Sequence, residues 1–197
     1  MTLTYARIFT NSKTAEAYLH IFDTLAEVIR EHTNSYPTWR HIHGEGWAYV
    51  LADMDSAQAK GLGMHLNRID STKTSEEHLQ HVLISCLVHF HRALQQKKFS
   101  DEIKKLMTKI PYVEDETYLN ETMDKLKAHP DKEVKEWVKF YSQPWLLASL
   151  SPIRTKVPLQ IFKHTSRSTN ASESNHANAN RSGRQMSLHA TVFRKKL

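Results

Sequence analysis

The sequence of 197 residues has little of several residue types, and each shortage excludes a class of protein. Its single cysteine, Cys86, excludes a framework of internal disulfides and weakly favours a reducing compartment. No apolar run approaches the roughly 20 residues needed to span a bilayer. The N-terminus also lacks the charged-then-apolar order of a signal peptide. We therefore expect a protein with no membrane partner, located in the nucleus or the cytoplasm.

Acidic residues are scarce in the last part of the chain. From Arg154 to Leu197 there are nine Lys and Arg residues and one acidic residue, Glu173, a balance of +8. Because the whole chain carries +6, the residues before Arg154 carry −2. This asymmetry predicts a C-terminal segment that faces a polyanion, although such basic residues are often only a solvated face. The residues expected to contact nucleic-acid phosphate are Arg154, Lys156, Lys163, Arg167, Arg181 and Arg184.

The residues that are present predict an α+β protein that is mostly helical. Runs at 5–10, 40–43 and 47–52 are typical of short strands or a loose hairpin, and helical spacing follows at 15–29 and 57–66. Gly61 and Gly63 either weaken the second of these helices or permit close backbone packing. A capping box at 74–77 precedes an apolar stripe at 79–94, which predicts one continuous helix. Between 100 and 143 the pattern predicts short helices broken at Pro111 and Pro130.

Two carboxylates far apart in the sequence are the candidate catalytic groups. Asp53 ends the apolar run 47–52, where a carboxylate at the tip of a buried strand would project into a cleft. Glu173 stands alone among basic groups and opens a segment with helical character. One carboxylate ending a strand and one opening a helix suggest a two-metal phosphoryl-transfer site. The simpler alternatives are that Asp53 caps the following helix, alone or with Asp55, and that Glu173 is a solvated residue.

Cys86 and His89 form a C-x-x-H pair on the apolar stripe. Cys86 has the position of a packed core thiol, and His89 lies one helical turn further on. Two ligands do not close a tetrahedral zinc site, and the chain has no second cysteine. The pair alone therefore gives little support for zinc.

The order of these motifs resembles a known family. The segment 52–63, the C-x-x-H pair inside a helix, a helical lobe, and the segment 169–175 with its T-N-x-x-E-S pattern are similar to the catalytic core of Mutator-like element (MULE) transposases, particularly those of fungal genomes. The resemblance covers about residues 5–191. It implies a ribonuclease-H-like fold with an Asp, Asp, Glu metal triad, an all-helical insertion before the Glu, and Mg²⁺ or Mn²⁺ as cofactor.

Carried onto this sequence, the resemblance makes Asp53 the second Asp of the triad, Glu173 its Glu, and Cys86 and His89 the C-x-x-H pair. The family's first Asp would precede Met1, and Asp23 lies on an amphipathic helix unsuited to that role. The chain thus looks like the C-terminal portion of a transposase core. Two carboxylates hold two cations poorly, so we expect metal binding to be weak or absent and an isolated chain to be inactive or nearly so.

The resemblance also implies a domain organisation and a partner. We expect a partial ribonuclease-H-like core lacking its first strands at 1–99, a helical insertion at 100–150, and a basic segment carrying the last acidic residue at 151–197. The expected partner is DNA, together with a partner that supplies the missing strands. The expected function is that of a transposase-derived fragment of a DNA phosphoryl-transfer core. The alternative is a non-enzymatic DNA-binding or interaction protein derived from a transposable element.

Overall fold

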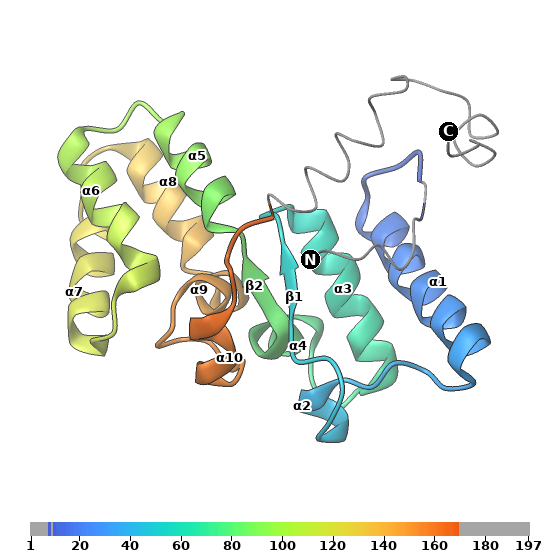
Figure 1. The fold of residues 1–197 in the computed structure, drawn as a ribbon. Coiled ribbons are helices and arrows are strands. Elements are labelled where there is room, and N and C mark those ends of the chain that lie inside the picture. Colours follow the sequence, from blue (N-terminus) through green and yellow to red (C-terminus); the bar gives the residue numbers. More distant parts are fainter. Residues whose placement is uncertain (1–7, 9, 170–197) are drawn as a thin grey trace, which may run out of the picture.

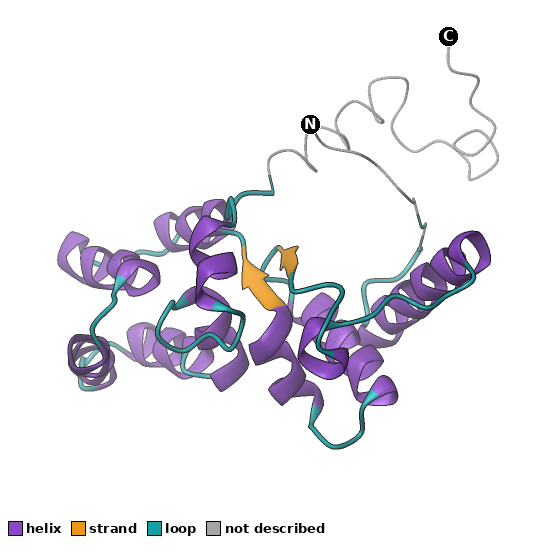
Figure 2. Ribbon diagram, turned by 60° about the horizontal axis from the view of Figure 1, so that its bottom comes forward, coloured by secondary structure: helices purple, strands orange, loops and turns teal. Residues whose placement is uncertain are grey.

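The computed structural model describes residue 8 and residues 10–169, in which short strands lie among helices (Figures 1 and 2). Its elements in chain order are α1 (Ala15–Thr33), α2 (Arg40–His43), β1 (Val50–Ala52), α3 (Ser56–Ile69), α4 (Ser75–Val82), β2 (Leu83–Ser85), α5 (Leu87–Gln95), α6 (Asp101–Lys109), the 3-10 turn η1 (Ile110–Tyr112), α7 (Glu116–Lys127), α8 (Lys132–Tyr141), α9 (Pro144–Leu150) and α10 (Leu159–His164). The α+β, mostly helical class is therefore confirmed. None of the described helices is long and apolar enough to cross a membrane.

The two strands form a small parallel sheet at the centre of the described residues. Val50 pairs with Leu83, Leu51 with Ile84 and Ala52 with Ser85. All three residues of β2 are buried, as expected of a parallel strand that is covered on both faces. Helices α1 and α3 lie on one side of the strands, and the lobe of α5 to α8 lies on the other (Figure 1). Helix α9 contacts both β2 and α4.

The continuous helix predicted over 79–94 is wrong, because the chain leaves the helix at Leu83 and forms β2 before α5 begins. The predicted capping box is present, with the Thr74 hydroxyl accepting from the Glu77 backbone and the Glu77 carboxylate accepting from the Thr74 backbone. The residues 82–88 include an almost unbroken apolar run, which suits a buried strand as well as a helix stripe. The pairing with β1 decides between them. Residues 40–43, interpreted as part of a strand or hairpin, form α2 instead.

Close backbone packing explains the glycines of α3. A Cβ built on Gly61 would lie 2.5 Å from Tyr18 Cβ and 2.7 Å from the Leu19 nitrogen, both on α1. Gly63 approaches the start of α4 in the same way, with its Cβ position 2.8 Å from the Ser75 carbonyl oxygen. The expectation that these glycines permit close packing is therefore confirmed. Two helices are held tightly against α3.

Aromatic side chains hold the helical lobe together. Trp137 stacks on Tyr141 with ring centroids 4.1 Å apart, and both rings are mostly buried. Tyr141 also meets the fully buried Phe90 of α5 edge to face at 5.6 Å. Offset and edge-to-face aromatic pairs add to the free energy gained by burying apolar area. These contacts join α8 to α5, the helix that begins beside the strand ends.

Candidate metal centre

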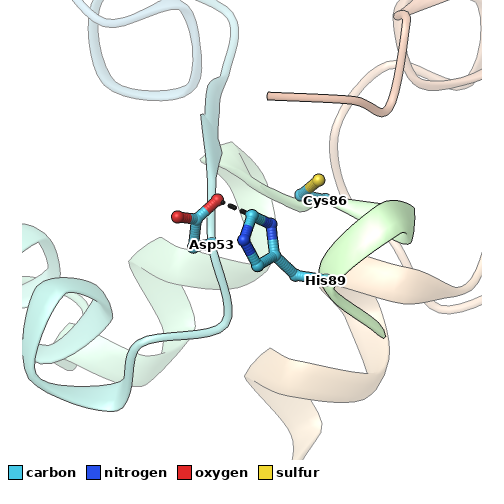
Figure 3. A group of neighbouring side chains, drawn as sticks. All are labelled: Asp53, Cys86 and His89. Carbon is cyan, nitrogen blue, oxygen red and sulfur yellow. Dashed lines mark ion pairs between the residues drawn. The ribbon is translucent and has the colours of Figure 1, made fainter. Parts of the chain in front are cut away.

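Asp53 and Cys86 occupy equivalent positions, each directly after a strand of the parallel sheet. Ala52 and Ser85 are paired partners at the ends of β1 and β2. The ladder continues one step further, because the Cys86 backbone N–H donates to the Ala52 carbonyl oxygen at 2.9 Å. Carboxyl ends of parallel strands meet at one edge of a sheet, which is where α/β proteins bind ligands. The strand pairing therefore brings these two side chains together (Figure 3).

His89 joins them from the first turn of α5. The helix begins at Leu87 with Cys86 at its N-cap position, so His89 lies one turn inside the helix. Its Nδ1 lies 3.0 Å from Asp53 Oδ1, and the side chains are 27% and 48% exposed. Cys86, by contrast, is fully buried. The three side chains form a small polar cluster that is open to solvent on the Asp53 side.

A third segment, which returns from α10, closes over the cluster. The Leu87 N–H donates to the Arg167 carbonyl oxygen at 2.9 Å, which fixes this segment against the start of α5. The hydroxyl of Thr169 lies 3.0 Å from Asp53 Oδ1 and 3.3 Å from Cys86 Sγ, and the Thr169 N–H donates to the same sulfur at 3.4 Å. Residues more than 80 positions apart are thus held within hydrogen-bond distance.

The surroundings of Cys86 favour its thiolate. Burial acts to raise the pKa of this thiol, but hydrogen bonds from Thr169 and from His89 outweigh burial and bring the pKa from 9.0 down to about 7. A thiolate is both the nucleophilic and the metal-binding form of cysteine. The sulfur is therefore in an environment that suits a metal ligand better than an inert core thiol.

Asp53, Cys86 and His89 could hold a metal ion. Each offers one ligand atom, and these atoms all lie within 4.8 Å of one another. The donors are a carboxylate oxygen, a sulfur and an imidazole nitrogen. Mg²⁺ prefers a set of oxygen ligands in near-octahedral geometry, whereas sulfur and nitrogen ligands suit softer ions. The described residues therefore do not fit Mg²⁺, and a set with two non-oxygen donors is also poor for Mn²⁺.

The structure brings Asp53, one of the two candidate catalytic carboxylates, together with Cys86 and His89, the C-x-x-H pair. Glu173, the other carboxylate, lies outside the described residues. Asp55 caps α3 by accepting from the backbone N–H groups of Ala57 and Gln58 at 2.8 and 3.0 Å. Asp53 is not the helix cap, so the simpler interpretation of this residue is wrong. Asp23 binds His65 and Arg68 at 2.7 and 2.6 Å, away from the cluster.

Most of the described basic candidates already have protein partners. Arg154 donates to Glu116 and to Asn120, and Lys163 donates to Glu114, at 2.6 to 2.7 Å. These contacts tie the segment after α9 to the region of α7.

Arg167 also has protein partners. It donates to the Leu150 carbonyl oxygen at 2.8 Å and stacks over Phe162, and burial lowers the pKa of its guanidinium to about 10. Lys156 is exposed, whereas Arg181 and Arg184 lie outside the described residues. A phosphate group that binds Arg154, Lys163 or Arg167 would thus have to compete with the protein partners of these side chains. Lys156 is the exception among the described basic candidates.

Sequence reasoning missed two features of the site. It did not pair Asp53 with Cys86 and His89 as a third metal donor, and it gave Thr169 no role. A signal for the first was present, because both Asp53 and Cys86 directly follow buried apolar runs. Thr169 opens the T-N-x-x-E-S segment, but that pattern does not indicate a contact with Asp53 or Cys86, which depends on the path of the chain after α10.

Comparison with known proteins identifies no relative: no protein-family model matches the chain, and no curated protein or solved structure is significantly similar to it.

Proposed function

We propose that the chain is part of a DNA phosphoryl-transfer core of the Asp, Asp, Glu type, related to Mutator-like element transposases, and that it binds DNA without cleaving it on its own. The fold of such a core would be ribonuclease-H-like. The observation that carries the proposal is the position of Asp53, directly beyond a parallel strand and in contact with the segment that leads to Glu173.

The return of the chain to Asp53 supports a shared role for the two carboxylates. Thr169 donates to Asp53 at 3.0 Å, and Glu173 follows Thr169 by four positions. Four residues of extended chain span at most about 14 Å, so the chain length between Thr169 and Glu173 allows both carboxylates to reach one pair of ions. The proposal requires that they do so, because carboxylates that hold the same metal ions lie close together.

The donor set of the cluster argues against metal-dependent cleavage by the chain on its own. Two-metal phosphoryl transfer depends on carboxylates that hold both cations, whereas Asp53 has a thiol and an imidazole as its described neighbours. This same observation favours the second candidate function, a DNA-binding or interaction protein that performs no chemistry. In either case the expected partner is the phosphate backbone, which the +8 balance after Arg154 would attract.

Fluorescence anisotropy with a labelled DNA duplex at several salt concentrations tests the proposal. We expect binding that tolerates any sequence and weakens steeply with salt, because neutralising phosphates releases counterions. The triple variant Lys156→Ala, Arg181→Ala and Arg184→Ala should flatten the salt dependence by about three units of slope. The matched control removes the same charge from exposed positions of the helical lobe, in Lys125→Ala, Lys132→Ala and Lys135→Ala, and should keep the slope.

A cleavage assay separates the two candidate functions from an active enzyme. With Mg²⁺ or Mn²⁺ and a labelled duplex, we expect no product above background. DNA affinity that is equal in the two triple variants would contradict the DNA-binding proposal. Cleavage that disappears in both Asp53→Ala and Glu173→Ala would show instead that the chain is a complete phosphoryl-transfer enzyme.

A further inference from the structure

Three different donor types meet at the strand ends, and their arrangement distinguishes a metal site from a nucleophilic relay. In a relay, one ring nitrogen of histidine faces the acid and the other faces the nucleophile. Here the same nitrogen, His89 Nδ1, lies 3.0 Å from Asp53 Oδ1 and 3.4 Å from the Thr169 hydroxyl, which itself lies 3.3 Å from Cys86 Sγ. The three donor atoms therefore lie around the Thr169 hydroxyl, which is 3.0 to 3.4 Å from each of them, instead of forming a line.

We propose that Asp53, Cys86 and His89 bind one Zn²⁺ ion, with water as the fourth ligand. A sulfur, an imidazole nitrogen and one carboxylate oxygen form a donor set that Zn²⁺ accepts in tetrahedral geometry. Ligands about 2.1 Å from a tetrahedral ion lie about 3.4 Å from one another. The three donor atoms already lie within 4.8 Å of one another, so small side-chain movements suffice to bring them to this spacing.

The backbone around the cluster is suited to hold such an ion. Asp53 and Cys86 extend from paired strands, and His89 extends from a helix whose first N–H group is bonded to Arg167. Thr169 contacts both the carboxylate and the sulfur, which is the kind of outer hydrogen bond that orients metal ligands. The ligands thus come from two segments, the end of β1 and the start of α5, and the fold has already brought both together beneath the Thr169 segment.

Binding would change the protonation of two ligands. Cys86 binds as the thiolate, so its thiol proton passes to the solvent. His89 binds through Nδ1 as the neutral tautomer with hydrogen on Nε2, and Asp53 exchanges its contact with Nδ1 for one with the ion. This inference concerns the described residues alone and does not depend on the proposed DNA-binding function.

Titration of the whole chain with Co²⁺ tests the proposal, since Co²⁺ takes the tetrahedral geometry of Zn²⁺ and gives a visible spectrum. Cys86 is the only cysteine in the chain, so a thiolate-to-cobalt charge-transfer band can arise from Cys86 alone. We expect this band together with tetrahedral ligand-field bands. Zn²⁺ should displace both at stoichiometric concentration, whereas millimolar Mg²⁺ should leave them unchanged.

Single variants test the three ligands. Cys86→Ser should abolish the charge-transfer band, and Asp53→Asn and His89→Gln should each weaken Co²⁺ affinity about a hundredfold or more, since outer-shell changes already cost 10-fold to 100-fold. His91→Gln is the matched control, because His91 is on the same helix but bonds to the Tyr112 hydroxyl at 3.0 Å. It should keep the wild-type spectrum and affinity.

A measurement on the unmodified chain covers the case in which a variant fails to fold. Zn²⁺ should raise the urea midpoint of the unmodified chain, because an ion that binds the folded form stabilises it, and a chelator should remove the increase. Co²⁺ that binds without a charge-transfer band would overturn the proposal. So would a band that keeps its full intensity and affinity in both Asp53→Asn and His89→Gln. Neither result would alter the salt dependence of DNA binding, so the two proposals fail separately.

Discussion

The sheet half of the molecule (α1 to α4, β1 and β2) and the helical lobe (α5 to α8) are held together by different means. In the sheet half, helix backbones approach closely at Gly61 and Gly63, and polar side chains bridge different elements, as Asp23 does between α1 and His65. In the lobe, large apolar rings such as Trp137 and Tyr141 fill the space between helices. The cluster of Asp53, Cys86 and His89 and a group of three histidines lie in the sheet half or at its border with α5.

We infer from this difference that the lobe mainly stabilises the fold, whereas the sheet half positions the polar site. Apolar packing is non-directional and tolerates adjustment, whereas a metal or proton site needs donors held in a fixed geometry. Paired strands and close helix contacts fix the backbone that carries Asp53 and Cys86, while α5 connects that edge to the lobe through Phe90. We therefore expect damage to the lobe to lower stability while the folded protein keeps its cluster.

The largest effect is expected from Trp137→Ala in the lobe. Trp137 is 7% exposed and stacks on Tyr141, so its removal leaves a cavity that should cost about 3 to 5 kcal/mol in the free energy of unfolding. Urea unfolding followed by circular dichroism measures the loss. Phe140→Ala, an adjacent change at a side chain that is 37% exposed, should cost less than half as much.

The same variant tests the separation of the two regions. Under conditions in which Trp137→Ala remains folded, its Co²⁺ spectrum should match that of the wild type. A folded variant with no tetrahedral cobalt bands would mean that the lobe positions the cluster, and the proposed division of roles would be wrong.

A smaller loss is expected from Gly61→Ala in the sheet half. Alanine should gain about 1 kcal/mol of helix propensity over glycine. The added Cβ would meet the backbone of α1 at 2.7 to 2.8 Å, and overpacking of this kind costs roughly 1 to 3 kcal/mol. We expect a net loss of up to about 2 kcal/mol in urea unfolding. Lys60→Ala, at the exposed neighbouring position, is the control and should change the free energy of unfolding little. If Gly61→Ala is more stable than the wild type, α1 can move away from α3 to make room for the added Cβ.

The sequence predicted local features of the sheet half better than the convergence of its strands. The capping box at Thr74 and the close approach at Gly61 follow from a few neighbouring residues, and both are present. The end of the helix at Leu83 was missed in the sequence analysis, because the apolar residues from 79 to 94 satisfy helical spacing. This local preference is overridden by the pairing of β2 with β1, which lies more than 30 residues away in the sequence. The site depends on the same pairing.

The last prediction concerns a second group of side chains in the sheet half, His41, His78 and His81, and has the smallest expected effect. His78 Nε2 lies 2.8 Å from the Asp70 carbonyl oxygen, which can only accept, so this nitrogen carries hydrogen. In the neutral ring His78 Nδ1 then accepts from His41 Nε2 at 2.8 Å. His41 Nδ1 is left as the atom that a proton must bind, and it is buried with no hydrogen-bond partner among the described residues.

Protonation of His41 should therefore oppose folding. Burial, followed by the neighbouring charges of His78, His81 and Lys73, lowers the pKa of His41 from 6.5 to about 4, against a smaller opposing effect of Asp70. Between pH 6.5 and pH 4 the unfolded chain binds this proton more readily than the folded one, so stability falls as the pH falls. His81, whose pKa burial also lowers, acts in the same direction. Allowing for partial exposure, His41 should contribute about 1 kcal/mol of this loss. Urea unfolding measures the free energy of unfolding at pH 7 and at pH 4.5. The difference between the two values should be smaller in His41→Gln than in the wild type, and equally so in His41→Phe, because neither replacement titrates. If both variants lose as much stability as the wild type between these pH values, His41 is not the cause.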